Sequence, residues 1–255
     1  MKKILALTFL GVFLIAGAVS AATLYVDKKS VCRSNSPCYT TINDAIGAAL
    51  VGDTVKVYPG VYREFVLIDK KVTLEAAQGQ PIIEWLNLTD HDPERYRGAI
   101  RIQTSEVTVR GFLLVSDGDV LAVACYTLGG APITATSHVL LEDNHIKGVR
   151  TEFTEPGNHR PGIFACNTSD LTVRENIVQN TTGTGIFLGQ GTVGTDVTNS
   201  FIEGNLVVDS EYTGIGLVGG SGNTVKWNDV RSAGIPEHTL DDGIRLGVRA
   251  FNNTV

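Results

Sequence analysis

Methionine is nearly missing from this chain, and histidine is sparse. The 255 residues contain one methionine, at position 1, and five scattered histidines. Because copper-handling proteins favour clusters of these two residue types, we do not expect copper chemistry. Basic residues are also few, with 21 lysines and arginines against 27 acidic residues. Since nucleic acids and anionic membranes require a basic footprint on the protein, neither is expected as a partner.

Long apolar runs are missing as well, except at the N-terminus. There two lysines precede an apolar run from Ile4 to Val19, and small residues follow it. This is the layout of a cleavable secretory signal over residues 1–21, and the run is shorter than the roughly 18 apolar residues of a membrane-spanning helix. Cleavage would remove both lysines and leave 19 basic and 27 acidic residues, a formal net charge of −8. We therefore expect a secreted, periplasmic or cell-surface protein without membrane contact after cleavage.

Residues 22–50 are predicted to hold a short strand, a disulfide loop and a capping helix. An exported chain can join its cysteines as disulfides, and Cys32 and Cys38 enclose only the short segment RSNSP. We therefore expect these two cysteines to pair. The helix is predicted over about residues 40–50, with Thr40 or Thr41 as its cap. Its apolar residues at helical spacing are Ile42, Ala45, Ile46 and Ala49.

Residues 51–255 consist of short β-branched runs separated by Gly, Asn, Asp and Pro, which is typical of strands and turns. One phrase recurs as VTVRGF, VLLEDN, LTVREN, SFIEGN and NTVKWN, and its asparagines lie 32, 29 and 23 residues apart. A second phrase follows the last four copies as PGIFA, TGIFLG, TGIGLV and DGIRLG. No room is left for a crossover helix, so we predict an all-β parallel β-helix. Leucine-rich repeats, the alternative, are dominated by leucine and steadier in length.

Stacking the first phrase in register creates columns of equivalent residues. Side chains in a strand alternate between its two faces, so each copy divides into inward and outward positions. The inward column is Val109, Leu141, Val173, Ile202 and Val225, and the outward column is Arg110, Glu142, Arg174, Glu203 and Lys226. Because each outward charge would lie between two of opposite sign, we interpret this column as structural. The column of Asn144, Asn176, Asn205 and Asn228 is expected to form a chain of side-chain amide hydrogen bonds.

The second phrase places Cys125 and Cys166 in one column on adjacent coils. A strand spacing of about 4.8 Å lies within the roughly 4.4–6.8 Å that separates the Cα atoms of a disulfide. We predict a second disulfide there, and two buried free thiols are the alternative.

The C-terminal end reads as incomplete. The segments SGNTV at Ser221 and FNNTV at Phe251 open successive coils in the same way. An open solenoid end exposes a strand edge that terminal repeats normally cap. We therefore expect either further coils after Val255 or a partner that covers this edge, and we favour further coils.

The helix, the segment GDTVKVYPGVYREFVLIDKKVTL and the two phrases together resemble the pectate-lyase-like family of right-handed parallel β-helix proteins. The resemblance runs from about Tyr39 to the end and implies that fold. The family contains polysaccharide lyases, glycoside hydrolases, epimerases and adhesins, so it implies a polysaccharide-related role. Among the motifs of its polygalacturonase-like members, only an Asp-Asp pair has a counterpart, Asp241-Asp242. Its pectate-lyase-like members hold calcium with aspartates and use an arginine as a base.

Residues next to the Gly-Ile anchors are expected to share one lateral face. Aromatic rings, carboxylates and arginines together are typical of a groove that binds sugar rings, hydroxyls or uronates. The candidates for substrate binding are His159, Arg160, Phe164, Phe187, Tyr212 and His238, and those for catalysis are Asp241, Asp242, Glu211 and Arg245. The simpler alternative is that Asp-Asp-Gly is an ordinary turn and that Arg245 only neutralises Asp242.

Two reactions are compatible with the catalytic candidates. In hydrolysis, one of Asp241 and Asp242 would be the general acid and Glu211 the base. In β-elimination on a uronate, the two aspartates would hold calcium, which is the one cofactor that we expect for this reaction. Arg245, Arg160 or a histidine would then take the C5 proton. The alternatives without catalysis are a carbohydrate-binding module and a surface or adhesive solenoid. We therefore predict an exported β-helix whose partner is a polysaccharide or cell-surface glycan.

Overall fold

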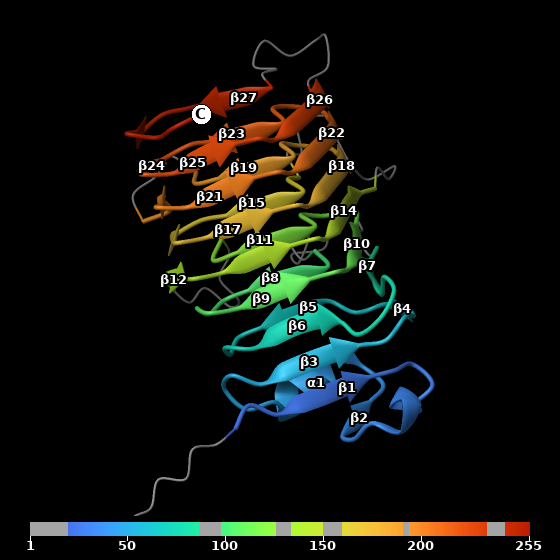
Figure 1. Ribbon diagram of the computed structural model, residues 1–255. Helices are drawn as coiled ribbons and strands as arrows, with labels where there is room; N and C mark the ends of the chain where they lie inside the picture. Colours follow the sequence, from blue (N-terminus) through green and yellow to red (C-terminus); the bar gives the residue numbers. More distant parts are fainter. Residues whose placement is uncertain (1–19, 87–97, 126–133, 150–159, 191–193, 234–242) are drawn as a thin grey trace, which may run out of the picture.

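The computed structural model describes residues 20–86, 98–125, 134–149, 160–190, 194–233 and 243–255. In these residues the chain winds into an elongated stack of coils, from β1 (Thr23–Val26) at one end to β27 (Ile244–Leu246) at the other (Figure 1). Short strands of successive coils pair in parallel and build sheets that extend along the stack. The predicted all-β parallel β-helix is confirmed.

Three sheets form the walls of the stack. In spatial order, the first sheet contains β2 (Cys38–Tyr39), β1, β3 (Thr54–Val57), β6 (Thr73–Ala76), β9 (Thr108–Arg110), β13 (Leu140–Glu142), β17 (Thr172–Arg174), β21 (Phe201–Glu203) and β25 (Thr224–Lys226). The second contains β4 (Val61–Tyr62), β7 (Ile82–Trp85), β10 (Leu113–Ser116), β14 (His145–Gly148), β18 (Ile177–Thr181), β22 (Leu206–Ser210) and β26 (Asp229–Ala233). The third contains β5 (Val66–Ile68), β8 (Ile100–Ile102), β11 (Leu121–Val123), β15 (Ile163–Ala165), β19 (Ile186–Leu188), β23 (Ile215–Leu217) and β27.

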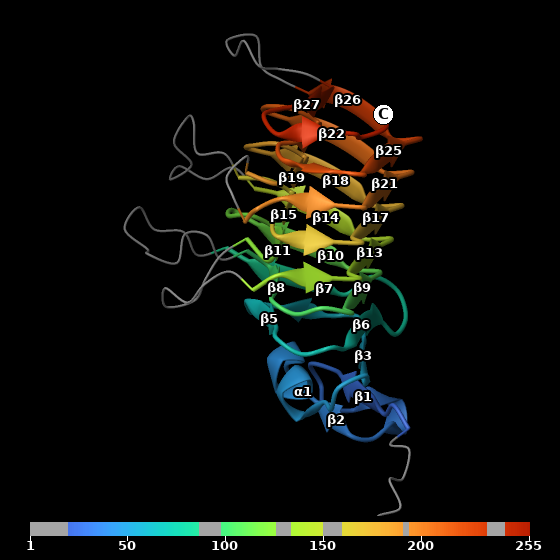
Figure 2. The ribbon, with the colours of Figure 1, turned by 90° about the vertical axis from the view of Figure 1, so that its left-hand side faces the viewer.

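Two smaller sheets follow the third wall at the next corner of the coils. They contain β12 (Thr136–Ser137), β16 (Thr168–Ser169) and β20 (Val197–Thr198), and then β24 (Gly220–Ser221) and β28 (Ala250–Phe251). Figure 2 shows the strands of the second sheet one above another along the stack. Equivalent residues of successive coils therefore lie directly above one another.

Helix α1 (Ile42–Ala48) lies at the N-terminal end of the stack, beside the first coil (Figure 2). Its buried residues are Ile42, Ala45 and Ile46. The helix begins after Thr41, whose Oγ1 accepts a hydrogen bond from the backbone N–H of Asp44 at 3.1 Å, as a cap residue does. It is shorter than predicted because Ala49 is already extended, with φ −64° and ψ 145°.

The core is built from inward-facing columns of valine, leucine and isoleucine. The five residues of the predicted inward column are each at most 1% exposed, and strand register adds Val55 and Leu74 to the same column. Burial of each such side chain contributes about 1.5–3 kcal/mol. The alternation that was read from the sequence thus places the core correctly.

Close stacking of the coils requires the glycine in three of the four Gly-Ile phrases, Gly162, Gly185 and Gly214, whereas a Cβ atom at Gly243 would meet nothing within 4 Å. A Cβ atom at Gly185 would lie 2.7 Å from the carbonyl oxygen of Gly214, and one at Gly162 would lie 2.8 Å from that of Gly185. Separations this short do not occur for real Cβ atoms, so any other residue would push the coils apart. The Gly-Ile phrase is therefore part of the scaffold.

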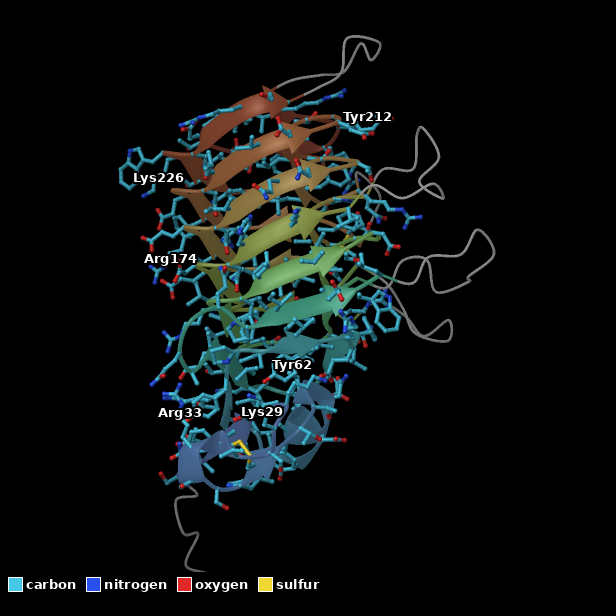
Figure 3. All side chains as sticks on the ribbon, turned by 90° about the vertical axis from the view of Figure 1, so that its right-hand side faces the viewer. Lys29, Arg33, Tyr62, Arg174, Tyr212 and Lys226 are labelled. Carbon is cyan, nitrogen blue, oxygen red and sulfur yellow. A yellow bond between two sulfur atoms is a disulfide. The ribbon has the colours of Figure 1, made fainter. Side chains whose placement is uncertain are left out.

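The charged column of the first sheet is longer than predicted. Strand register places Lys56 and Glu75 ahead of Arg110, so that seven charges alternate in sign along one line. Glu75 pairs with Lys56 at 3.2 Å and accepts a hydrogen bond from Arg110 Nε at 2.8 Å. Figure 3 shows Arg174 and Lys226 on the same side of the stack. Exposed ion pairs contribute only about 0.2–1 kcal/mol each, so the main effect is to keep like charges apart.

The asparagine column forms the predicted chain of amides. Asn144 Nδ2 donates to Asn176 Oδ1 at 3.1 Å, and Asn176 Nδ2 donates to Asn205 Oδ1 at 3.0 Å. Asn205 Nδ2 donates to Asn228 Oδ1 at 2.9 Å. Asn176 Nδ2 also donates to the backbone carbonyl of Leu141 at 2.9 Å. The polar groups of a turn that enters the core are therefore satisfied without water.

The first prediction concerns the pH dependence of stability. Burial raises the pKa of Glu75, but the hydrogen bonds and charges of Arg110 and Lys56 outweigh it and hold that pKa below its ordinary value of 4.5. Unfolded Glu75 therefore binds protons more readily, and its stabilising contribution is present above about pH 4.5 and is lost as pH falls through the folded pKa. In urea titrations, wild type should lose stability more steeply below pH 4.5 than Glu75→Gln. Identical slopes would contradict this.

The second prediction concerns the amide chain. Asn176→Ala should lower the free energy of unfolding by about 3 kcal/mol or more, because buried groups left without a partner cost about 1–3 kcal/mol each. Asn228 is the matched control, since it lies in the same column but is only half-buried. Water can replace its amide, so Asn228→Ala should cost about 1 kcal/mol. Urea denaturation measures both values. Equal losses of stability would contradict the explanation that the burial of each amide determines its contribution.

Candidate functional site

The outer face of the third sheet presents one column of central residues. In each three-residue strand the first and third side chains face the core, so the middle one points outward. In register, these middle residues are Leu67, Arg101, Ala122, Phe164, Phe187, Gly216 and Arg245. Unlike the charged column of the first sheet, this column changes its chemistry from rung to rung.

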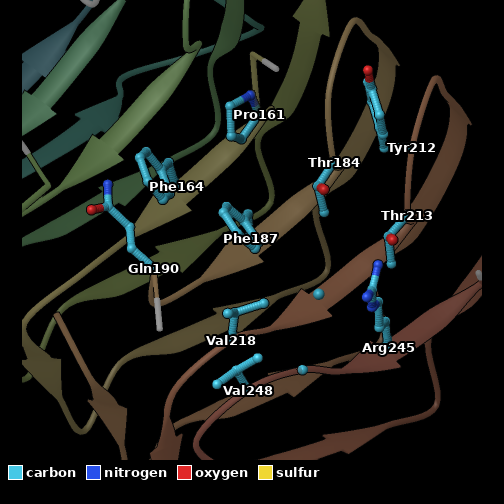
Figure 4. Close-up of a pocket in the computed structure, with 12 residues that line it drawn as sticks. Pro161, Phe164, Thr184, Phe187, Gln190, Tyr212, Thr213, Val218, Arg245 and Val248 are labelled. Carbon is cyan, nitrogen blue, oxygen red and sulfur yellow. The ribbon is translucent and has the colours of Figure 1, made fainter. Parts of the chain in front are cut away.

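A groove of ≈ 450 Å³ runs over the C-terminal half of this column (Figure 4). Its lining is Pro161, Phe164, Thr184, Phe187, Gln190, Tyr212, Thr213, Gly216, Val218, Arg245, Gly247 and Val248. The lining combines aromatic and aliphatic surface with a few hydroxyl, amide and guanidinium groups. This is the composition of a small-molecule or sugar site, in which apolar area supplies affinity and a few polar groups fix orientation.

The aromatic part of the groove is a stack of two rings. The centroids of Phe164 and Phe187 lie 5.4 Å apart, and the ring planes differ by 13°. Phe164 is 4% exposed, whereas Phe187 is half-buried. Such a pair contributes about 0.5–1.5 kcal/mol beyond its buried area. Both rings line the groove, and Phe187 presents the more exposed surface to it.

A disulfide lies against this stack. Cys125 and Cys166 are bonded, with their Cα atoms 4.8 Å apart, and they pack in one cluster with Phe164 and Phe187. This bridge joins the ends of β11 and β15, the adjacent coils on which the sequence placed the two cysteines. The N-terminal pair expected from the sequence, Cys32 and Cys38, is bonded as well.

Arg245 is the charged member of the groove. It is half-buried, and within the described ranges it makes no hydrogen bond, ion pair or ring contact. Arg101, at the other end of the column, is 3% exposed and lies over the ring of Phe65 at 5.5 Å. An unpaired guanidinium in a partly buried groove can bind carboxylate or hydroxyl oxygens of a ligand.

The other sequence candidates are dispersed. Tyr212 lines the groove, and Figure 4 shows it at the edge beyond Thr184 and Thr213. Glu211, its neighbour in sequence, lines a separate hollow of ≈ 420 Å³ together with Lys147 and Asp209. Arg160 is 6% exposed and is not part of the groove lining. Asp241, Asp242, His159 and His238 lie outside the described residues.

Several lining residues were not among the sequence candidates. Gln190, Val218 and Val248 follow the third-sheet strands and form the opposite edge of the groove from Tyr212. The sequence could have indicated them, because each lies one or two residues after the leucine of the second phrase. The candidates come from the residues before the Gly-Ile anchor and from the outward residue of each strand, so this edge is not among them.

In the described part of the chain, no group of three or more His, Cys, Asp and Glu side chains could hold a metal ion. Asp241 and Asp242, the calcium ligands expected from the sequence, lie outside this part. No helix within the described ranges is long and apolar enough to cross a membrane.

Comparison with known families identifies the architecture. Residues 97–230, more than half of the chain, match the family model described as a right handed beta helix region. The chain belongs to the right-handed β-helix family. The expected pectate-lyase-like fold, with its right-handed coils, is thereby confirmed. A comparison of this β-helix protein with curated sequences finds no match.

Solved structures resemble this β-helix protein in fold alone. A pectin methylesterase in complex with a hexasaccharide is 12% identical with a TM-score of 0.49, and 81% of this chain aligns with 66% of that one. Pectin methylesterase PemA from Erwinia chrysanthemi is 13% identical with a TM-score of 0.46, over 82% of this chain and 62% of that one. An alginate lyase from Paenibacillus sp. is 11% identical with a TM-score of 0.33, over 91% and 95%. The chain thus covers just under two thirds of the two esterases.

The third prediction compares the two disulfides. Serine replacement of Cys125 and Cys166, which are 41 residues apart, should lower the free energy of unfolding by about 4 kcal/mol. Without this bridge the unfolded chain is no longer held in a long closed loop, so the entropy of the unfolded state rises. Serine replacement of Cys32 and Cys38, which are 6 residues apart, should cost about 2 kcal/mol. Urea denaturation of both pair variants gives the two values. A larger loss for the N-terminal pair would contradict the loop-entropy explanation.

Proposed function

We propose that this protein binds a polysaccharide along the groove of the third sheet. The observation that carries the proposal is the position of Arg245, a guanidinium that has no partner among the described residues and lies in the same groove as the Phe164–Phe187 stack. Elsewhere on the surface the outward charges of the first sheet are paired. A scaffold that pairs its charges on one face and leaves a cation among aromatic rings on another is suited to a ligand with apolar faces and oxygen substituents.

The groove lining fits a sugar chain in its distribution of chemistry. Aromatic and aliphatic side chains can contact the apolar faces of sugar rings, while Thr184, Thr213, Tyr212 and Gln190 can exchange hydrogen bonds with hydroxyls. The groove crosses one strand from each of four successive coils, namely β15, β19, β23 and β27. It therefore follows the long axis of the stack. An extended chain would lie along this axis and contact one coil after another.

Export to an oxidising compartment belongs to the same proposal. The described residues hold two disulfides and no free cysteine, and disulfides persist in secreted, periplasmic and cell-surface proteins. The N-terminal segment with the layout of a secretory signal supports the same compartment. An extracellular or periplasmic location would bring the groove into contact with polysaccharides of cell surfaces and walls.

Binding, rather than a named reaction, is the function that we propose. The described lining of the groove contains no carboxylate, and Glu211 lies in the neighbouring hollow. Cleavage would therefore depend on Asp241 and Asp242, either with one of them as the general acid and a second carboxylate as the base, or with both as calcium ligands and Arg245 as the base. Products separate the reactions: an unsaturated product that absorbs in the ultraviolet marks elimination, and new reducing ends without that absorbance mark hydrolysis.

The fourth prediction tests binding at the groove. Phe187→Ala should weaken binding at least tenfold, because the stacking of a sugar ring on the aromatic face is lost together with the apolar area that it buries. The readout is calorimetric titration with a panel of neutral and uronic-acid hexasaccharides, alongside the melting temperature of each variant.

Phe201→Ala is the matched control for this variant. Phe201 is 45% exposed on the outward side of the first sheet, away from the groove, so its loss should leave affinity unchanged. Equal weakening by both variants would contradict the assignment of the groove. If the wild type binds no oligosaccharide of the panel, the proposed function is wrong.

A further inference from the structure

One face of the aromatic stack is left uncovered by a glycine. Phe187 packs against Phe164 on one side, and on its other side the next residue of the column is Gly216. A Cβ atom at Gly216 would lie 3.2 Å from Cδ2 of Phe187. A side chain at this position would therefore continue the stack, as Phe187 continues it from Phe164. Its absence leaves the second face of Phe187 open to the groove.

Arg245 bounds the same space from the other side. It is the next residue of the column after Gly216, so Phe187 and Arg245 lie two strand spacings apart, about 9.6 Å. A ring held between them at carbon contact distances of about 3.5–4.0 Å on each side needs about 7–8 Å. Two stacked rings would need about 11–12 Å. The space between Phe187 and Arg245, here called the Gly216 slot, therefore admits one ring and not two.

The edges of the Gly216 slot differ in chemistry. Thr184 and Thr213 lie along one edge, and Val218 and Val248 lie along the other, as Figure 4 shows. A ring inside the slot would direct its hydroxyl groups to the threonines and its apolar edge to the valines. The arrangement thus fixes the orientation of a ring as well as its position.

We propose that a single sugar ring of the bound polysaccharide occupies the Gly216 slot, stacked on Phe187 and hydrogen-bonded to Arg245 through a carboxylate or hydroxyl substituent. This inference rests on the proposed function, and it makes Gly216 a residue that determines specificity. The polysaccharide binds with one ring held over Gly216, between the side chains of Phe187 and Arg245, rather than with all its rings flat on an aromatic surface. Gly216 contributes by leaving space, because a side chain there would occupy the position of the ring.

The fifth prediction fills the slot. Gly216→Phe should fold, because the column already accepts two phenylalanines on adjacent rungs, and it should weaken oligosaccharide binding at least tenfold. Thr172→Phe is the matched control, since it adds a phenylalanine one rung from Phe201 on the first sheet. Calorimetric titration uses the hexasaccharide that binds the wild type most tightly, and Thr172→Phe should bind it within twofold of the wild type.

Gly216→Ala guards against a folding defect. It adds one carbon atom 3.2 Å from Cδ2 of Phe187, so this ring must shift by only a few tenths of an ångström. The variant should melt close to the wild type and should weaken binding to a smaller degree than Gly216→Phe. If the wild type binds and both Gly216 variants bind as tightly as the wild type, the proposal of the Gly216 slot is wrong and the proposed function stands. If the wild type binds no member of the panel, the proposed function itself fails.

Arg245→Gln separates the two substituents that the slot could recognise. Weakening that is confined to uronic-acid hexasaccharides assigns a carboxylate to Arg245, because an amide cannot form the ion pair. Equal weakening with neutral hexasaccharides assigns hydroxyl groups. Unchanged binding of both kinds would overturn the role of Arg245 in the slot.

Discussion

The parallel register between coils is the constraint on which the rest of the structure depends. Strands of successive coils pair residue on residue, so every side chain lies about 4.8 Å from its equivalents above and below. Each residue of a column must therefore be compatible in charge, hydrogen bonding and size with the equivalent residues of the adjacent coils. Charges satisfy this by alternating in sign, as Glu75 and Arg110 do, and asparagines satisfy it by bonding amide to amide. Glycines satisfy it at Gly185 and Gly214, where a Cβ atom would lie 2.7 and 2.8 Å from a carbonyl oxygen of the next coil.

The same constraint underlies our proposal that the third sheet is the binding face. Its outward column does not repeat one solution but changes from aromatic rings at Phe164 and Phe187 to Gly216 and then Arg245. Such a change leaves a face of one ring uncovered and a guanidinium without a partner in the described chain. Because the column offers no internal partner for either group, a ligand can supply both contacts. The disulfide between Cys125 and Cys166 holds the base of the stack in place.

Much of the fold could be predicted because columns follow from period and alternation alone. The inward column, the amide chain and the Cys125–Cys166 disulfide needed only the spacing of the repeated phrases, and the Cys32–Cys38 disulfide followed from the short segment between the two cysteines. The turns are different, since loop lengths vary between coils and their geometry depends on tertiary packing. This is why the second polar chain was missed, in which the backbone N–H of Ser200 donates to Asn223 Oδ1 and that of Asn223 donates to Asn253 Oδ1. It is also why Glu211 and Tyr212, adjacent in sequence, line different hollows.

The most direct test of a polysaccharide site on the third sheet is a crystal structure of the protein with its tightest-binding hexasaccharide. The account predicts one sugar ring over Gly216, with its carbon atoms about 3.5–4.0 Å from the ring of Phe187. It also predicts an oxygen substituent about 2.9 Å from a guanidinium nitrogen of Arg245. A hexasaccharide bound to the charged column of the first sheet, or anywhere that leaves Phe187 and Arg245 without contact, would contradict the account.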